Sequence, residues 1–240
     1  ALDFTVTLRE VSWVVIGFSL TVTALLLPMG RFSDLIGRKK TLVSGIGVFI
    51  LGSLICYFAK TFLILILGRV VMGIGASMGQ GVGTAIVVSV FPKNERGKAI
   101  GAHTTAVALG AAGGPVVAGI LLQFYTWHAI FLAMAVPAIF AFFLGILVLD
   151  DARIGSFQSK NKVFDWTGAV LSAFLMLFFV FTLNSPFPYE YNLWVLIFGI
   201  PATLILLGVF VFWELNEDSP LLDLKLFSNK VFSYATLTRF

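Results

Sequence analysis

The chain has 240 residues, of which 59% are hydrophobic and 12% are charged, and its mean hydropathy is +1.00. Soluble globular proteins carry about 25% charged residues, so no soluble core could bury this much apolar surface. The net charge of +4 and the pI near 9.3 do not indicate nucleic-acid binding, because the basic residues lie in short segments between apolar stretches, where membrane orientation and anionic lipid explain them. The composition therefore indicates an all-α polytopic membrane protein.

Seven nearly uncharged stretches of roughly 19 to 25 residues are each long enough to cross the roughly 30 Å hydrocarbon core of a bilayer. Five of them are framed by ionisable residues: 11–30, 41–59, 70–92, 166–189 and 191–213. The run 99–149 contains no Asp, Glu, Lys or Arg, so it predicts two further spans. We expect the chain to turn between these two spans at the polar aromatic patch 123–128.

Basic residues lie on alternate connections between these spans. Twelve of them follow the first, third, fifth and seventh spans: Arg31, Arg38, Lys39, Lys40, Lys93, Arg96, Lys98, Arg153, Lys160, Lys162, Lys225 and Lys230. The start of the chain and the other connections hold only Arg9 and Lys60. The positive-inside rule therefore predicts that the first group faces the cytoplasm and that the chain starts outside.

Both ends of the chain suggest a piece of a larger protein. The chain opens on Ala1 without a full leading span, and it stops within the apolar segment 231–240, which is too short to cross a bilayer. We therefore expect at least one further helix upstream. The single cysteine, Cys56, lies inside a span, so it predicts neither a disulfide framework nor a thiol metal site.

The first basic connection, residues 30–40, has the sequence GRFSDLIGRKK. We expect Gly30 and Gly37 to let the backbone turn between two spans, and Asp34 to pair with Arg38 or to face a helix N-terminus. A plain basic stop-transfer loop would have a similar composition. The spacing of these four residues, however, resembles the loop motif G-x-x-x-D-x-x-G-R-K of the major facilitator superfamily.

Arg69 borders the uncharged stretch 70–92 and follows eight further uncharged residues, so we place it within the third span. A guanidinium inside a bilayer costs several kcal/mol unless it faces protein or water, which favours a functional role. The alternative is an arginine near the end of the span that extends to the interface. The segment resembles a part of the superfamily in which an arginine precedes Q-G-x-G-A and is associated with proton coupling, although Met72 stands here where Gln is usual.

The next basic connection, residues 91–99, contains Glu95 and Arg96. It resembles the second cytoplasmic loop of the superfamily, which acts as a gate hinge, and it is equally typical of a simple charged turn.

The fourth span contains the sequence GAAGGPVVAG at residues 110–119. Small residues let a neighbouring helix approach closely, and Pro115 removes a backbone hydrogen bond and bends the helix. Such packing motifs are common in membrane helices, but this one resembles the antiporter motif G-x-x-x-G-P-x-x-G-G of the exporter branches, with Ala118 for one glycine. The motif residues are Gly110, Gly114, Pro115 and Gly119.

The second half of the chain resembles the fourteen-helix drug/proton antiporters of this superfamily. Trp127, His128 and Pro137 lie in a segment similar to the start of the sixth helix of drug exporters, where we expect His128 to be a solvated interface residue. The segments DWTG at 165–168 and PLLDLKLFSNKVF at 220–232 resemble the two extra central helices of that branch. The predicted parts are an N-terminal bundle lacking its first helix (1–149), a cytoplasmic linker (150–165), two extra central helices (166–230) and the start of a C-terminal bundle (231–240).

The resemblance implies a partial major facilitator superfamily helix bundle in the cell membrane, covering helices two to eight and the start of nine. It implies export of drug-like amphipathic compounds in exchange for protons, with two bundles rocking around a midplane cavity. Asp34 and Arg38 would hold the cytoplasmic side closed, Arg69 would take part in proton coupling, and residues 110–119 would form a close-packed, bendable interface. The expected partners are a small molecule, protons and the lipid bilayer.

Other functions stay open at this stage. A proton-coupled importer of a small nutrient would share the loop motif, and a receptor or assembly subunit would need no transport of its own. We expect no enzyme activity, metal ion or cofactor, because no cluster of His, Cys or paired acidic residues lies within the spans to hold a metal or activate a nucleophile.

Overall fold

The computed structural model describes residues 4, 6–150, 154, 164–183, 189–217, 219–222, 224 and 234. These residues fall into two compact units, one within Ala1–Lys160 and one within Asn161–Phe240, and each unit is considered by itself. Every regular element of the described residues is an α-helix. Seven of these helices are long and apolar enough to cross a membrane, which confirms the predicted polytopic helical fold.

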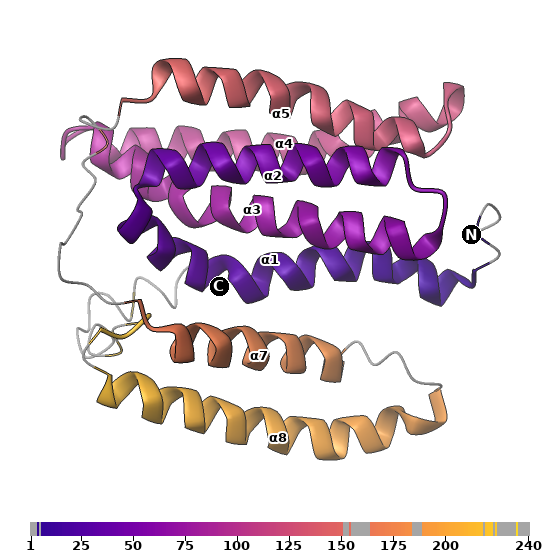
Figure 1. Cartoon of the computed structure of the whole chain (residues 1–240), viewed down its shortest axis with the longest axis vertical. Helices are drawn as coiled ribbons and strands as arrows, with labels where there is room; N and C mark the ends of the chain where they lie inside the picture. Colours follow the sequence, from indigo (N-terminus) through magenta and orange to yellow (C-terminus); the bar gives the residue numbers. More distant parts are fainter. Residues whose placement is uncertain are drawn as a thin grey trace. The chain divides into compact units, whose positions relative to one another are not determined.

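Unit 1 contains helices that alternate in direction (Figure 1). They are α1 (Leu8–Ile36), α2 (Arg38–Tyr57), α3 (Phe62–Val90), α4 (Arg96–Phe124) and α5 (His128–Val148). Helices α1, α2 and α3 pack against one another, and α5 packs along α2. Because successive helices are antiparallel, the α1–α2 joint, the α3–α4 connection and the end of α5 lie at one end of the unit. We call this the basic end, since it carries the basic connections.

Helix α3 packs against its two neighbours through glycines on two faces. A Cβ atom added to Gly75 would lie 2.5 Å from the carbonyl oxygen of Gly45 in α2. A Cβ atom added to Gly73 would lie 2.7 Å from the Cβ of Thr21 in α1. Without side-chain bulk, the backbones of both neighbours come into direct contact with α3, as is typical of membrane helix pairs.

The prediction that Gly30 turns the backbone was wrong. Gly30 lies inside α1, and its amide nitrogen is 3.0 Å from the position of a Cβ on Gly81 of α3, so Gly30 is a helix-packing residue. Only Gly37 separates α1 from α2, with a φ of 100° that L-residues rarely adopt. The predicted loop is therefore a joint of one residue.

Helix α3 begins eight residues earlier than the uncharged stretch 70–92 suggested. Thr61 precedes its first residue, and its hydroxyl accepts a hydrogen bond from the amide of Ile64 at 3.3 Å. This cap satisfies a backbone donor that the first turn of a helix leaves unpaired. As a result Arg69 lies well inside α3. The predicted turn within 123–128 is confirmed, since α4 ends at Phe124 and α5 begins at His128.

Helix α4 differs from its neighbours because none of its residues is buried. It contacts α3 and α5 over short stretches only. One of these contacts places the imidazole Nε2 of His103 3.3 Å from the position of a Cβ on Gly83. Most of α4, including the segment with the small residues, therefore faces away from the rest of unit 1.

Unit 2 contains the hairpin formed by α7 (Trp166–Leu183) and α8 (Tyr189–Asn216). Asp165 caps α7, because its Oδ1 accepts a hydrogen bond from the amide of Gly168 at 2.8 Å. The indole Nε1 of Trp213 in α8 donates to both oxygens of the same carboxylate, at 3.2 and 3.1 Å. The buried Asp165 therefore ties the start of α7 to the end of α8. Residues 151–153 and 155–163 of the predicted linker, and 231–240 apart from Tyr234, lie outside the described residues.

Candidate functional site

The predicted pairing of Asp34 with Arg38 is present at the basic end. Asp34 lies in the last turn of α1 and Arg38 is the first residue of α2, and Asp34 Oδ1 is 3.7 Å from Arg38 Nη2. Arg38 Nη1 also donates a hydrogen bond to the carbonyl oxygen of Ala85 in α3, at 3.4 Å. One guanidinium thus connects three helices at their basic ends.

Two buried hydroxyl residues hold the joint between these helices, and both lie four positions from Gly37. The Gly37 amide donates to the carbonyl of Ser33 at 3.0 Å, and the Gly37 carbonyl accepts from both the amide and the hydroxyl of Thr41, each at 3.0 Å. Ser33 and Thr41 are 2% and 0% exposed. The sequence does not predict these bonds for Ser33, which uses its backbone carbonyl, so only the hydroxyl of Thr41, four positions after the glycine, is a usable sequence signal.

The side chain of Asp34 is more exposed than that of Arg38. The side chain of Arg38 is 19% exposed, whereas that of Asp34 is 33% exposed. An ionised carboxylate can accept several hydrogen bonds, and the Arg38 contact occupies only part of that capacity. Asp34 can therefore bind a donor outside α1, α2 and α3 while it keeps its ion pair.

Arg69 is held between α3 and α1. Its Nε donates a hydrogen bond of 2.8 Å to the carbonyl oxygen of Val14, and its guanidinium carbon lies 4.4 Å from the ring centroid of Phe18. The residue is seven positions after Phe62, which corresponds to roughly 10 Å of helix rise. Arg69 therefore faces protein within the span and is stabilised by a carbonyl and an aromatic face, as a charge at this depth requires.

Met72 lies one turn after Arg69, at the position where the superfamily motif usually has Gln. Its side chain is fully buried, and its sulfur lies 3.8 Å from the Sγ of Cys56 in α2. Both side chains belong to the apolar core of unit 1, together with Phe131 of α5. Met72 is thus a packing residue here. Arg69 lies one helical turn before it in α3.

The second connection, Phe91–Glu95, is short and exposed, and Arg96 is the first residue of α4. Arg96 Nε donates to the carbonyl oxygen of Phe91 at 3.2 Å, which ties the start of α4 to the end of α3. Glu95 is exposed and occupies the N-cap position without a side-chain capping bond. Arg96 therefore connects α3 and α4, whereas Glu95 lies at the surface of the basic end.

The small residues of α4 make no close helix contact among the described residues. A Cβ atom added to Gly110, Gly114 or Gly119 would meet nothing within 4 Å, and Pro115 lies inside a helix that continues to Phe124. The close-packed interface expected from this segment is therefore not formed by the described helices of unit 1, and it stays a prediction for the longer protein.

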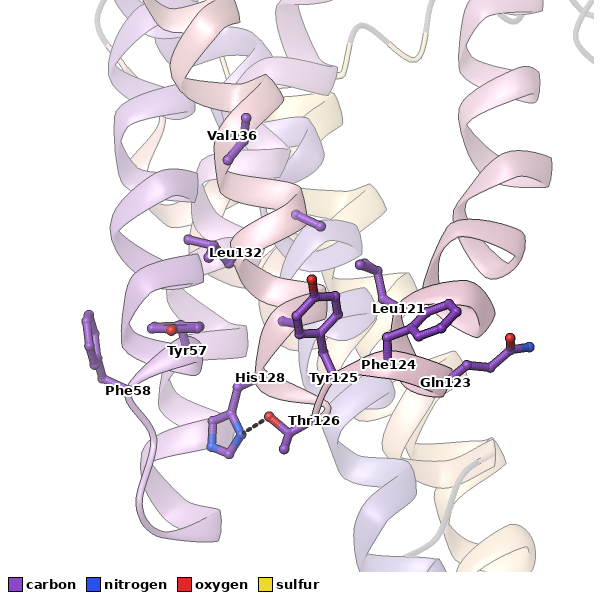
Figure 2. Close-up of a pocket in the computed structure, with 12 residues that line it drawn as sticks. Tyr57, Phe58, Leu121, Gln123, Phe124, Tyr125, Thr126, His128, Leu132 and Val136 are labelled. Carbon is purple, nitrogen blue, oxygen red and sulfur yellow. Dashed lines mark hydrogen bonds between the residues drawn. The ribbon is translucent and has the colours of Figure 1, made fainter.

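An open cavity of about 1140 Å³ lies at the end of unit 1 opposite the basic end (Figure 2). It is lined by the last residues of α2 and α4 and by the first turns of α5, and we call it the aromatic cavity. The sequence predicts only a turn for residues 123–128. The turn carries the aromatic residues Phe124, Tyr125 and Trp127, but the approach of Tyr57 and Phe58 from the end of α2 is seen only in the structure.

No group of three or more His, Cys, Asp or Glu side chains within the described residues could hold a metal ion. The contacts described above are an ion pair, hydrogen bonds to backbone carbonyls and ring contacts.

Comparison with known proteins identifies the family. The Major Facilitator Superfamily profile matches residues 1–215. The chain is 32% identical over 237 residues to the Riboflavin transporter RibZ of Clostridioides difficile, covering 99% of this chain and 50% of that protein. It is 30% identical over 226 residues to the Methyl viologen resistance protein SmvA of Salmonella typhimurium, covering 93% and 44%.

A third similar protein is the Multidrug resistance protein B homolog of Mycobacterium tuberculosis, which is 30% identical over 240 residues, covering 98% of this chain and 43% of that protein. The chain thus spans about half the length of the curated relatives that it matches. The superfamily is a family of transporters and not a class of enzymes. With its profile matched over most of the sequence and its helices able to cross a bilayer, the chain belongs to the major facilitator superfamily and is a multi-pass protein of the cell membrane.

Proposed function

We propose that the whole protein exports drug-like amphipathic compounds in exchange for protons, by alternating access between two helix bundles. The observation that carries this proposal is the arrangement at the basic end, where Arg38 binds both Asp34 and the carbonyl of Ala85. It is supported by relatives named for resistance to methyl viologen and to multiple drugs.

In this mechanism Asp34 closes the cytoplasmic side of the transporter. Arg38 holds the ends of α1, α2 and α3 together, so the carboxylate of Asp34 is presented on a fixed scaffold. Its exposed part accepts hydrogen bonds from a helix of the other bundle in the outward-facing state. Opening toward the cytoplasm breaks that contact, while the ion pair with Arg38 keeps the carboxylate in position for the next closure.

Arg69 supplies the coupling to protons. A guanidinium within the span stabilises the ionised form of any carboxylate that comes near it, so it promotes proton release from that carboxylate. Because Val14 and Phe18 belong to α1, a shift of α1 relative to α3 changes the position of this charge. Proton binding and helix movement are thereby linked through one residue.

The small residues of α4 form the interface with the other bundle. Gly110, Gly114 and Gly119 lie on a helix with no buried residue among those described, so the surface they offer is accessible to a helix from elsewhere in the protein. Pro115 lets this helix bend while the interface rearranges. In the same proposal, residues 1–149 form the N-terminal bundle, 150–165 the linker, 166–230 the two extra helices of a fourteen-helix exporter and 231–240 the start of the second bundle.

The test uses the complete gene product in lipid vesicles with an acidified lumen. Addition of ethidium or methyl viologen should release protons from the lumen, because each compound enters in exchange for a proton that leaves. Vesicles with the Asp34→Asn variant should release protons more slowly, by roughly tenfold or more, at equal protein content. Compound entry with no proton movement in the wild type would contradict the coupling, and no compound movement at all would contradict the export function.

A second candidate function is proton-coupled import of a small nutrient, which the similarity to a riboflavin transporter favours. The same reconstituted protein distinguishes it, in vesicles with the opposite proton gradient, acidic outside, and with riboflavin as the added compound. An importer carries the compound and the proton in the same direction, so a proton gradient directed inward should drive riboflavin accumulation. An exporter under this gradient should expel riboflavin from preloaded vesicles.

A further inference from the structure

We propose that Ile154, in the connection after α5, is a positioning residue for Arg38, and that it links this connection to the contacts of Arg38 at the basic end. In this role Ile154 acts through the spacing of α2 and α3 and needs no contact with a transported compound. The inference rests on the proposed export function for its effect on transport. Its structural part follows from contacts within unit 1.

Ile154 is buried although the segment before it is charged. The connection begins with Asp150, Asp151, Ala152 and Arg153, and the side chain of Ile154 is only 2% exposed. The amide of Ile154 donates a hydrogen bond to the carbonyl oxygen of Asp150 at 3.1 Å, which closes a single turn after α5. Because the connection belongs to the basic side, an undocked isoleucine would face water, and the hydrophobic effect favours its burial. The turn therefore directs one apolar side chain back onto unit 1.

The partners of Ile154 lie on α2 and α3 and at the end of α5. Ile154 forms a buried cluster with Val82 and Ile86 of α3, which are 0% and 8% exposed. Leu42 of α2 and Leu149, directly after α5, pack against this cluster. Val82 and Ile86 lie four positions apart, so they share one face of α3. One side chain of the connection therefore takes part in the packing between these helices.

The cluster adjoins the contacts of Arg38. Leu42 lies four positions after Arg38, so both lie on one face of α2. Ala85, whose carbonyl oxygen accepts from Arg38 Nη1 at 3.4 Å, directly precedes Ile86 in α3. This distance exceeds the usual range for an N–H···O hydrogen bond, so a small further separation of α2 and α3 would break the contact. Ile154 holds the two helices at the spacing at which Arg38 still reaches α3.

Backbone contact between α2 and α3 does not fix this spacing at the basic end. Closer to the middle of the helices, a Cβ atom added to Gly45 would lie 2.9 Å from the carbonyl oxygen of Gly75. Toward the basic end, a Cβ atom added to Gly79 would lie 3.8 Å from Cδ1 of Leu42, which is an ordinary side-chain contact. Side chains, with Ile154 among them, therefore fill the space between the two helices near Arg38.

The place of Ile154 in the chain gives the contact a second consequence. Ile154 is the last described residue of unit 1, and the chain continues from it toward α7. A movement that draws the connection away from α3 removes Ile154 from the cluster, so the spacing of α2 and α3 changes and the bond of Arg38 changes with it. A displacement elsewhere in the protein is thereby passed on to the basic end.

The alternative is that Ile154 only covers the apolar end of α5. In that case its loss lowers the stability of unit 1 in general, and its effect is the same whether or not Arg38 reaches α3. A double-mutant cycle separates the two explanations, because only residues that act on one another show effects that do not add.

The first experiment measures amide hydrogen exchange of the full-length protein in lipid nanodiscs, without a proton gradient. Ile154→Ala should raise exchange in the first two turns of α2 and the last two turns of α3 roughly tenfold, because the cavity lets these ends separate. Ile154→Val removes one methyl group and should give a smaller increase. The control Ile146→Ala changes an isoleucine of α5 that is 43% exposed and should leave this exchange unchanged.

The second experiment measures export in vesicles at equal content of folded protein. Ile154→Ala should lower the maximal rate roughly tenfold, in line with its effect on exchange, and leave the concentration of compound at half-maximal rate unchanged. Ile154→Leu, which has a similar volume, should retain most of the rate.

The cycle combines Ile154→Ala with Arg38→Lys, which keeps the positive charge but loses the planar group that reaches Ala85. Added to Arg38→Lys, Ile154→Ala should have little further effect on the export rate. The exchange rates of the same four proteins give the cycle independently of transport.

Unchanged exchange in Ile154→Ala, or an effect of Ile154→Ala that is as large in Arg38→Lys as in the wild type, would overturn the inference. These outcomes are separate from those of the export test. If the wild type exports compounds and Ile154→Ala exports them at the same rate, the positioning role is wrong and the export proposal stands. If the exchange cycle shows the coupling but the wild type moves no compound, the positioning of Arg38 stands and the export proposal is wrong.

Discussion

Arginines in unit 1 bind backbone carbonyls of neighbouring helices. Arg38 donates to Ala85 of α3, and Arg69 donates to Val14 of α1. A helical carbonyl oxygen has a second lone pair, so it can accept this extra bond without losing the helical one. A hydrogen bond to a charged group contributes about 1.5 to 3 kcal/mol, which stabilises the contact between helices without the need for an acidic partner.

Asp34→Asn tests the residue at the basic end. The variant removes the negative charge, so the contact with Arg38 and with any donor of the other bundle weakens, and we expect export to fall roughly tenfold or more. The measurement is the initial rate of dye efflux at equal protein content, with size-exclusion chromatography to check folding. Glu217→Gln, which removes a carboxylate that follows α8 in unit 2, is the matched control. Wild-type efflux in Asp34→Asn would reject its closing role.

Arg69→Ala tests the coupling residue. Without the guanidinium, the affinity of the proton carrier no longer depends on a nearby positive charge, so we expect efflux to lose most of its dependence on pH. Arg69→Lys keeps the charge but not the planar donor that binds Val14, and it should show an intermediate profile. The measurement is the efflux rate across a pH series, with the exposed Lys60→Ala as control. A pH profile of Arg69→Ala identical to the wild type would contradict the role.

At the scale of elements, α3 is the central helix of unit 1 and α4 is the least attached one. The glycines of α3 bring two neighbours into backbone contact, whereas a Cβ atom added to any glycine of α4 would meet nothing within 4 Å. Substitution of a glycine by a larger residue should therefore destabilise the protein in α3 and have little effect in α4.

Gly52→Ala tests the packing of α2 on α3. The added Cβ would lie 2.5 Å from the amide nitrogen of Met72, a backbone atom that cannot move without shifting the helix. Overpacking of this kind costs about 1 to 3 kcal/mol, so we expect a lower melting temperature of the purified protein. Gly101→Ala in α4 is the control, because its Cβ meets no atom and alanine favours the helix by about 1 kcal/mol. Equal destabilisation by both changes would contradict the packing described.

Trp213→Phe tests the hairpin of unit 2. The variant keeps the aromatic bulk but removes the indole donor that binds both oxygens of Asp165, at a cost of about 1.5 to 3 kcal/mol. We expect faster hydrogen exchange of the amides in the first turn of α7, measured by mass spectrometry. Trp194→Phe, which changes an exposed indole of α8, should leave this exchange unaltered. Unaltered exchange in both variants would show that Asp165 does not depend on Trp213.

At the scale of the whole molecule, the spans and the Asp34–Arg38 pair could be predicted because they depend on local properties. Hydropathy and charge are properties of short stretches, and a pair four residues apart is set by helix geometry. The contact of Gly30 with Gly81, the carbonyl partner of Arg69 and the aromatic cavity depend on how each helix is rotated toward its neighbours. No local pattern in a single sequence contains that rotation, so these features came only from the structure.

Cysteine labelling tests the predicted topology of the whole chain. Lys40→Cys and Lys93→Cys should react with a membrane-impermeant thiol reagent only from the cytoplasm, and Thr61→Cys only from outside, because basic connections are retained inside. Cys56 has no exposed surface, so its background reaction should be low. Labelling of positions 40 and 93 from opposite faces would contradict the arrangement of all the helices described.

The one-residue joint at Gly37 also limits how this protein can be engineered. An epitope tag or fluorescent domain inserted there would separate Asp34 from Arg38 and would remove the carbonyl that Thr41 holds. The contacts described for the exposed connection Phe91–Glu95 are local, such as the hydrogen bonds of Arg96 to Phe91 and Pro92, so an insertion there disturbs no contact between three helices. Probes for imaging or purification on this face therefore belong between α3 and α4.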